Sequence, residues 1–255
     1  MRKVLVFLCI LVSFCIVSPA FALFVNGGFE TGDTTGWTVT GDRGVISSFT
    51  PQFNNTTGWS SGIPYYGDYS LLLGSPGVGN EWDDYQTSAS TQIGTVTSDD
   101  LAAGLHLFFR WGAILEEPTN YVHPDEDQPY FSIEVSTRAD STVAWNSIYS
   151  EDQRANQTGF TKIGTETSGD AGDIWYGTDI ADFDLSTIGL AVGHQVLVEL
   201  FVQDCGAGGH GGLVFLDGFG TTNPGDPVPE PATMLLLGTG LAGLAGYGRR
   251  KRKKK

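Results

Sequence analysis

The chain has 255 residues, with 14 Lys and Arg against 29 Asp and Glu, so its formal net charge at pH 7 is −15. A surface of this charge repels nucleic acids and anionic lipid headgroups, and the composition therefore excludes a nucleic-acid-binding function. The many aromatic and β-branched residues argue against a disordered chain.

The start of the chain predicts a secretory signal peptide over residues 1–22. Two basic residues come first, residues 4–17 form an apolar run, and Ala20 and Ala22 provide the small residues that a signal peptidase recognises. We therefore expect the mature chain to begin at Leu23 and to lie outside the cytoplasm.

Residues 23–220 are expected to form one all-β domain, a jelly-roll-like antiparallel β-sandwich. Apolar and polar residues alternate in short segments, Gly-rich or Asp-rich turns separate these segments, and no helical period is sustained between them. The clearest segment is residues 130–137, where Phe131, Ile133 and Val135 share one face. The other predicted strands are residues 70–73, 89–96, 105–111, 196–203 and 213–219. Residues 221–228 predict a flexible linker.

The two ends of this domain resemble those of a known fold. Residues 23–37, with the run Asn26-Gly27-Gly28-Phe29-Glu30, resemble the opening of galactose-binding-like jelly rolls and carbohydrate-binding modules, and residues 212–218 resemble their closing strand. The resemblance implies a structural calcium ion between these ends, with carboxylates from Glu30 and Asp217 and an oxygen from Asn26. The alternative is that Asn26 is a turn residue and Asp217 ends a strand.

A second set of polar residues, dispersed in the sequence, contains the residue types that a zinc site or a catalytic nucleophile would need. Residues 105–220 resemble a β-sandwich domain of secreted bacterial proteins, a resemblance that implies no activity. We favour the interpretation that Cys205 is buried and that its Gly-rich loop is closed by these polar groups. The candidates are Glu116, His123, Asp204, Cys205 and His210.

Several aromatic residues lie among Asn, Ser, Gly and Asp in predicted loops. A flat ring with polar neighbours suits a sugar, because the ring contacts the C–H face and the amides bind hydroxyls. The alternative is that these rings cover the core of the sandwich. The candidates are Trp59, Tyr65, Tyr66, Trp82 and Tyr85.

The C-terminal segment, residues 229–255, has three parts. Pro229-Glu230-Pro231 precedes the uncharged residues 232–248, which predict a transmembrane helix, and residues 249–255 are all Arg or Lys and predict a cytoplasmic end. This order resembles the PEP-CTERM sorting domain. The resemblance implies processing by an exosortase near Pro-Glu-Pro, so that the membrane anchor belongs to the precursor.

We therefore predict an exported, non-enzymatic protein of the cell surface or extracellular matrix. It would be anchored in the inner membrane before processing, and it would act by adhesion or by interaction with exopolysaccharide. One alternative is a calcium-dependent carbohydrate-binding module of the lectin type, and another is a secreted hydrolase that uses Cys205 or a carboxylate pair. The sequence has no Gly-x-Ser-x-Gly, His-Glu-x-x-His or phosphate-loop motif that would favour catalysis.

Overall fold

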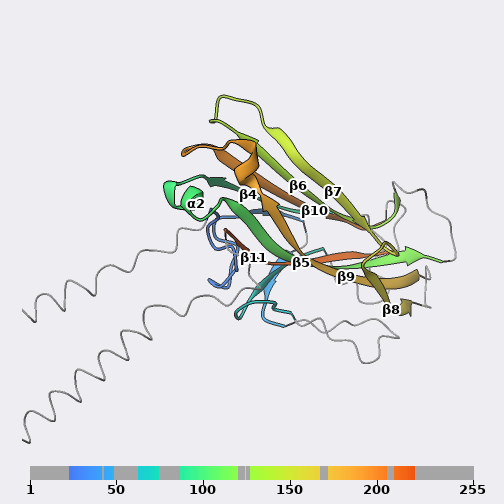
Figure 1. Cartoon of the computed structure of the whole chain (residues 1–255). Coiled ribbons are helices and arrows are strands. Elements are labelled where there is room, and N and C mark those ends of the chain that lie inside the picture. Colours follow the sequence, from blue (N-terminus) through green and yellow to red (C-terminus); the bar gives the residue numbers. More distant parts are fainter. Residues whose placement is uncertain are drawn as a thin grey trace, which may run out of the picture.

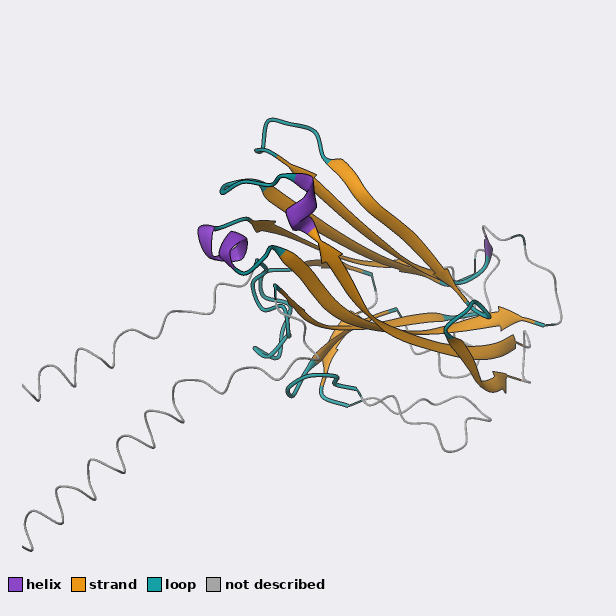
Figure 2. Cartoon of the chain, in the orientation of Figure 1, coloured by secondary structure: helices purple, strands orange, loops and turns teal. Residues whose placement is uncertain are grey.

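The computed structural model of the chain describes residues 23–41, 43–48, 63–74, 87–119, 124, 127–166, 172–205 and 210–221. In this part of the chain, antiparallel strands form two layered sheets, and the helical segments are short (Figures 1 and 2). The predicted all-β sandwich is therefore confirmed. The predicted signal peptide, the linker after residue 221 and the sorting segment lie outside the described residues.

One sheet has five strands, which we call sheet A, in the order β1-β4-β10-β6-β7. Its strands are β1 (Thr38–Thr40), β4 (Thr87–Thr95), β10 (Gln195–Gln203), β6 (Tyr130–Arg138) and β7 (Asn146–Arg154). The other sheet, sheet B, has six strands in the order β2-β3-β11-β5-β9-β8. Its strands are β2 (Arg43–Ile46), β3 (Ser70–Leu73), β11 (Gly212–Gly220), β5 (His106–Pro118), β9 (Gly172–Asp184) and β8 (Phe160–Glu166).

Two short helical segments connect strands at one end of the sandwich. Helix α2 (Ser98–Ala102) begins at Thr97, whose side chain accepts a hydrogen bond from the Asp100 backbone N–H, while the Asp100 carboxylate accepts from Thr97 in return. The 3₁₀ segment η2 (Leu185–Ile188) follows β9, and the Asp184 side chain caps it by accepting from the Ser186 N–H.

The main core lies between the sheets and follows from the alternation of the strands. On β6 the side chains of Phe131, Ile133 and Val135 are buried in this core, whereas the residues between them lie on the outer face of sheet A. A second, smaller apolar cluster covers the outer face of sheet B under the segment that begins at Ile63, and it includes Leu72 and Phe215.

The opening segment, residues 23–37, fills the inter-sheet space beside β11. Its Gly27 carbonyl accepts a hydrogen bond from the Phe219 N–H of β11, so the opening segment lies against the last strand. No strand is formed there among the described residues, because the segment runs through successive turns. Its rings complete what we call the aromatic cluster, which consists of Phe24, Phe29, Trp37, Phe109 and Phe219.

Candidate functional site

The inter-sheet space is open along the edge formed by β7 of sheet A and β9 of sheet B. Inward positions on β7 carry Glu151 and Gln153, which pair with the core residues Ile133 and Phe131 of β6. Inward positions on β9 carry Gly177 and Asp179, which pair with Ala113 and Trp111 of β5. Small or polar residues thus occupy positions where apolar side chains would otherwise close the sandwich.

A groove follows this edge from the turn between β7 and β8 to η2. It consists of two adjoining cavities of about 620 and 500 Å³, which share Trp111, Glu151, Gln153 and Asp179. We call these cavities together the inter-sheet groove. Its size lies within the range of cavities that hold small organic ligands.

Two aromatic rings lie in the first cavity. The rings of Trp111 and Phe160 are 6.2 Å apart at an interplanar angle of 32°. Phe160 can approach β9 because its strand partner is Gly177, where a Cβ atom would come within 2.7 Å of the Phe160 ring. The glycine therefore helps to set the position of Phe160 in the groove.

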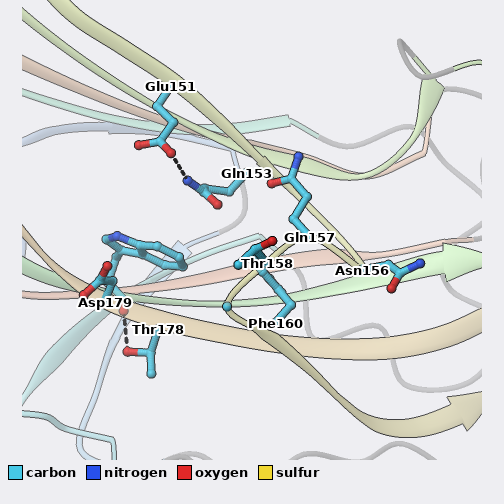
Figure 3. A pocket seen from close by; sticks show the side chains of 10 residues that line it. Glu151, Gln153, Asn156, Gln157, Thr158, Phe160, Thr178 and Asp179 are labelled. Atoms are coloured by element: carbon cyan, nitrogen blue, oxygen red, sulfur yellow. Dashed lines mark hydrogen bonds between the residues drawn. The ribbon is translucent and has the colours of Figure 1, made fainter.

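Polar side chains surround these rings on both sheets (Figure 3). Glu151 and Gln153 lie on one side, where the Gln153 amide donates to the Glu151 carboxylate at 2.6 Å. Asp179 lies on the other side, whereas the neighbouring Thr178 points to the outer face of sheet B, and its hydroxyl donates to the Trp111 carbonyl at 2.6 Å. The arrangement offers both donors and acceptors next to apolar ring surface.

The turn between β7 and β8 closes one end of the groove and is built by its own side chains. Gln157 accepts a hydrogen bond from the Arg154 N–H through its amide oxygen, and its carbonyl accepts from the Phe160 N–H. The Asn156 amide donates to the Glu117 carboxylate of sheet B at 3.3 Å. These contacts connect the two sheets and position Asn156, Gln157 and Thr158 around the cavity.

The predicted calcium ligands Glu30 and Asp217 are neighbours in the structure. Both flank Gly28, where a Cβ atom would lie 3.5 Å from Glu30 Cγ and 3.9 Å from Asp217 Oδ1. The Glu30 carboxylate accepts from the backbone N–H groups of Asp68 and Tyr69 at 3.0–3.1 Å. The opening segment and β11 therefore meet at the segment of residues 63–70.

Asp217 is fully buried, and its two oxygens differ. Oδ2 accepts hydrogen bonds from the backbone N–H groups of Tyr65 and Tyr66 and from the Ser70 hydroxyl, at 2.9–3.1 Å. Oδ1 is buried and accepts no hydrogen bond from the described residues. Burial raises the pKa of Asp217 to about 7. A buried carboxylate oxygen without a donor fits a cation, which would stabilise the ionised form.

Asn26, the third predicted calcium ligand, has its side chain engaged in the opening turn. Its amide oxygen accepts from the Thr31 N–H, and its amide nitrogen donates to the Asp33 carbonyl at 2.9 Å. Among the described residues, no three His, Cys, Asp or Glu side chains form a metal-binding group. Any calcium ion at Glu30 and Asp217 would thus need further oxygens, such as backbone carbonyls.

The second predicted polar group is brought together in part. Glu116 and Gly211 exchange two hydrogen bonds, from the Glu116 N–H to the Gly211 carbonyl and from the Gly211 N–H to Glu116 Oε2. The Cys205 N–H donates to the His210 carbonyl at 2.9 Å, which closes the Gly-rich loop at its base. The side chains of Glu116, Asp204, Cys205 and His210 are all buried, and His123 lies outside the described residues. The zinc and nucleophile interpretations of this group stay predictions.

Of the predicted sugar-stacking residues, Tyr65 and Tyr66 are described. Tyr65 packs on the outer face of sheet B, where Arg110 lies 4.3 Å from its ring centroid and its hydroxyl is 2.8 Å from that of Tyr176. Burial raises the pKa of the Tyr65 hydroxyl above its ordinary value. Tyr65 and Tyr66 are partly buried, and Trp59, Trp82 and Tyr85 lie outside the described residues.

The sequence prediction missed the residues of the inter-sheet groove. β7 and β9 lack a clean alternation of apolar and polar residues, because polar side chains also occupy their inward positions. A polar residue at an inward position is the signal that could have identified the groove. Which positions face inward can be told only when the pairing of each strand is known.

Comparisons with known proteins cover both the sandwich and the tail. Residues 227–253 match the family model described as the PEP-CTERM protein-sorting motif, which indicates an exported protein. Its Pro229-Glu230-Pro231 run and the predicted helix lie outside the described residues, and in the described part of the chain no helix is long and apolar enough to span a membrane. No curated protein matches the chain.

Three similar solved structures are carbohydrate-binding modules. The module CBM27-1 of Caldicellulosiruptor saccharolyticus, in complex with mannohexaose, is 16% identical, with 79% of this chain and 97% of that chain covered and a TM-score of 0.37. CBM28, specific for non-crystalline cellulose, is 13% identical, with coverages of 77% and 93% and a TM-score of 0.37. A third structure comes from a study of the promiscuous specificity of carbohydrate-binding modules of the β-sandwich superfamily. It is 15% identical, with a TM-score of 0.36, and the match covers 76% of this chain and 59% of that chain. The likeness concerns the fold alone.

Proposed function

We propose that the protein binds polysaccharide in the inter-sheet groove and performs no catalysis. The observation that supports this proposal best is the polar or small character of the adjacent inward positions 151 and 153 on β7 and 177 and 179 on β9. Filling these positions with apolar side chains would increase the buried apolar area and stabilise the sandwich. The chain instead keeps an open, lined groove there, which is typical of a binding site.

The lining suits a sugar better than it suits a purely apolar ligand. Trp111 and Phe160 offer ring surface for the C–H face of a pyranose, and Gln153, Asn156 and Gln157 offer amides for its hydroxyls. Trp111 is only 7% exposed, and it lines both cavities of the groove.

The groove proposal can be tested with the full-length chain purified in a detergent without a sugar headgroup, because a glycoside detergent would compete for the site. Calorimetry with soluble oligosaccharides should show binding. Replacing Trp111→Phe together with Phe160→Leu should weaken it about tenfold, since aromatic ring contact with the sugar is lost. Phe201→Leu on the outer face of sheet A, where Phe201 packs beside Tyr130, is the matched control.

Two outcomes of this experiment would contradict the proposal. In the first, the Trp111→Phe, Phe160→Leu double variant binds as tightly as the wild type, and the Phe201→Leu control loses affinity. This result would place the binding site on the outer face of sheet A. In the second, the wild type releases new reducing ends from the oligosaccharides and the Glu151→Gln variant does not. This result would favour the hydrolase alternative, because Glu151 and Asp179 supply two carboxylates to one groove.

We further propose that the sorting segment determines where this binding takes place. A signal peptide over residues 1–22 would export the chain, residues 232–248 would hold the precursor in the membrane, and an exosortase would process it at Pro229-Glu230-Pro231. The groove would then act at the cell surface or in the matrix, by adhesion or by contact with exopolysaccharide. Glu230→Gln should leave an unprocessed precursor on immunoblots, and identical processing of both forms would contradict this role.

Calcium at Glu30 and Asp217 is proposed as a structural ion. Asp217 lies on the outer face of sheet B, whereas the groove faces the inside of the sandwich, so an ion there would not contact a bound glycan. The calcium-dependent lectin alternative predicts direct loss of binding on chelation. Our proposal predicts that chelation lowers stability and leaves glycan affinity unchanged while the protein remains folded.

A further inference from the structure

Among the described residues that line the inter-sheet groove, all charged residues are acidic. The first cavity holds carboxylates from both sheets, Glu151 of β7 and Asp179 of β9. Asp182 and Asp184 border the second cavity, but they alternate along β9 with the inward residues Ala181 and Phe183, so their carboxylates lie on the outer face of sheet B. No Lys, Arg or His belongs to the described residues that line either cavity.

These carboxylates differ in how they are compensated. Asp182 and Asp184 lie 2.9 and 3.9 Å from the ring nitrogens of His106, which is stacked on Phe108. Among the described residues, neither Glu151 nor Asp179 has a cation within ion-pair distance; Glu151 accepts from Gln153, and Asp179 from the Ile180 N–H. The first cavity therefore holds two uncompensated carboxylates on facing strands, next to the Trp111 and Phe160 rings.

We propose that the polysaccharide bound in this groove carries protonated amines, so that its class is an amino-sugar glycan. This inference rests on the proposed glycan-binding function. An ammonium group on the sugar would form charge-assisted hydrogen bonds with Glu151 and Asp179, which are stronger than neutral ones. A glycan of uronic acids would place its carboxylates against these groups and be repelled.

The rest of the lining favours a glycan over another cationic polymer. The rings of Trp111 and Phe160 offer apolar surface that fits the C–H face of a sugar. The amides of Gln153, Asn156 and Gln157 can both donate to and accept from hydroxyl groups. A basic peptide would use the carboxylates but would leave the ring surface and the amides without matched partners.

The test compares oligosaccharides of equal length and different charge on the full-length chain at low ionic strength. The probes are hexamers of glucosamine, N-acetylglucosamine, glucose and galacturonic acid, at a mildly acidic pH at which the amines are protonated. The glucosamine hexamer should bind about tenfold more tightly than the neutral hexamers, which corresponds to ~1.4 kcal/mol. The galacturonic acid hexamer should not bind, and added salt should reduce the preference.

Two double variants separate an effect in the groove from an effect of net charge. Glu151→Gln with Asp179→Asn should bring the affinity for the glucosamine hexamer down to that of the neutral hexamers measured on the same variant. The control, Glu134→Gln with Glu199→Gln, neutralises a cross-strand pair on the outer face of sheet A and changes the net charge equally. It should leave the preference for glucosamine intact.

The outcomes distinguish this inference from the function on which it rests. Equal binding of neutral and amine-bearing hexamers would overturn the amino-sugar inference and leave glycan binding in place. Absence of binding by every hexamer would overturn the proposed function itself. Tighter binding of a lysine hexapeptide than of the glucosamine hexamer, lost in the groove double variant, would assign the groove to a basic peptide and overturn the glycan proposal.

Discussion

The two sides of the inter-sheet space contrast in what fills them. Beside β11 the aromatic cluster closes the space, with Phe219 lying 4.5 Å from Phe109 and 4.7 Å from Trp37 between ring centroids. Along β7 and β9 the corresponding inward positions carry Glu151, Gln153 and Asp179, and the space is open to solvent. One side therefore holds the fold together, and the other is available to a ligand.

A sandwich of this kind can separate stability from binding within one inter-sheet layer. Apolar burial contributes about 25 cal/mol per Å² removed from water, so the aromatic cluster supplies a large stabilising contribution. The groove contributes little of this kind, because its polar groups stay hydrated. Changes on the closed side should therefore alter unfolding, and changes on the open side should alter binding.

The largest expected effect is on the closed side. Phe109→Ala removes a fully buried ring that contacts Phe219 and Phe183, and it should lower the free energy of unfolding by about 3–5 kcal/mol. Urea unfolding of the full-length chain, followed by Trp fluorescence, measures the change. A loss below about 1 kcal/mol would show that the cluster is not the stabilising side of the sandwich.

The sequence predicted the closed side far better than the open one. Clean alternation marks β6 and a mostly apolar run marks β10, and both strands were identified close to their observed bounds. β7, β8 and β9 were missed, because a strand beside a groove carries polar residues on both faces and loses the period of two.

The same contrast applies to the predicted sites. Glu30 and Asp217 were identified because they lie in the runs that resemble a known fold, and the structure brings them together. Trp111, Gln153 and Asp179 lie on three different strands, so their common groove depends on the pairing of β5, β6, β7 and β9. Such pairing across long sequence separations cannot be derived from local patterns.

An intermediate effect should follow from removal of calcium, because Glu30 and Asp217 adjoin Phe29 and Phe219 of the aromatic cluster. At a calcium concentration 100 times its Kd, binding to the folded state adds about 2.7 kcal/mol, which a chelator would remove. Differential scanning fluorimetry should show a lower Tm with chelator for the wild type and for a Glu134→Gln control. Asp217→Asn should show no calcium dependence.

The same experiment tests whether the calcium ion acts on the closed side alone. If the ion is structural, glycan affinity measured well below the Tm should not change when calcium is removed. An unchanged wild-type Tm in chelator would contradict the calcium site. The buried Asp217 would then keep its proton, and Asp217→Asn would cost little, because an amide can replace a neutral carboxylic acid.

The smallest effect on stability is expected from Gln153→Leu on the open side. Gln153 is half-buried at an inward position, so a leucine there gains apolar contact with the Trp111 edge of the groove while the Glu151 carboxylate loses its amide donor. These opposing contributions should leave the free energy of unfolding within about 0.5 kcal/mol of the wild type. Glycan binding should nevertheless fall, because the leucine occupies the groove and removes an amide. A large change in stability with unchanged glycan affinity would mean that β7 closes the sandwich as β11 does, and the separation of the two sides would be wrong.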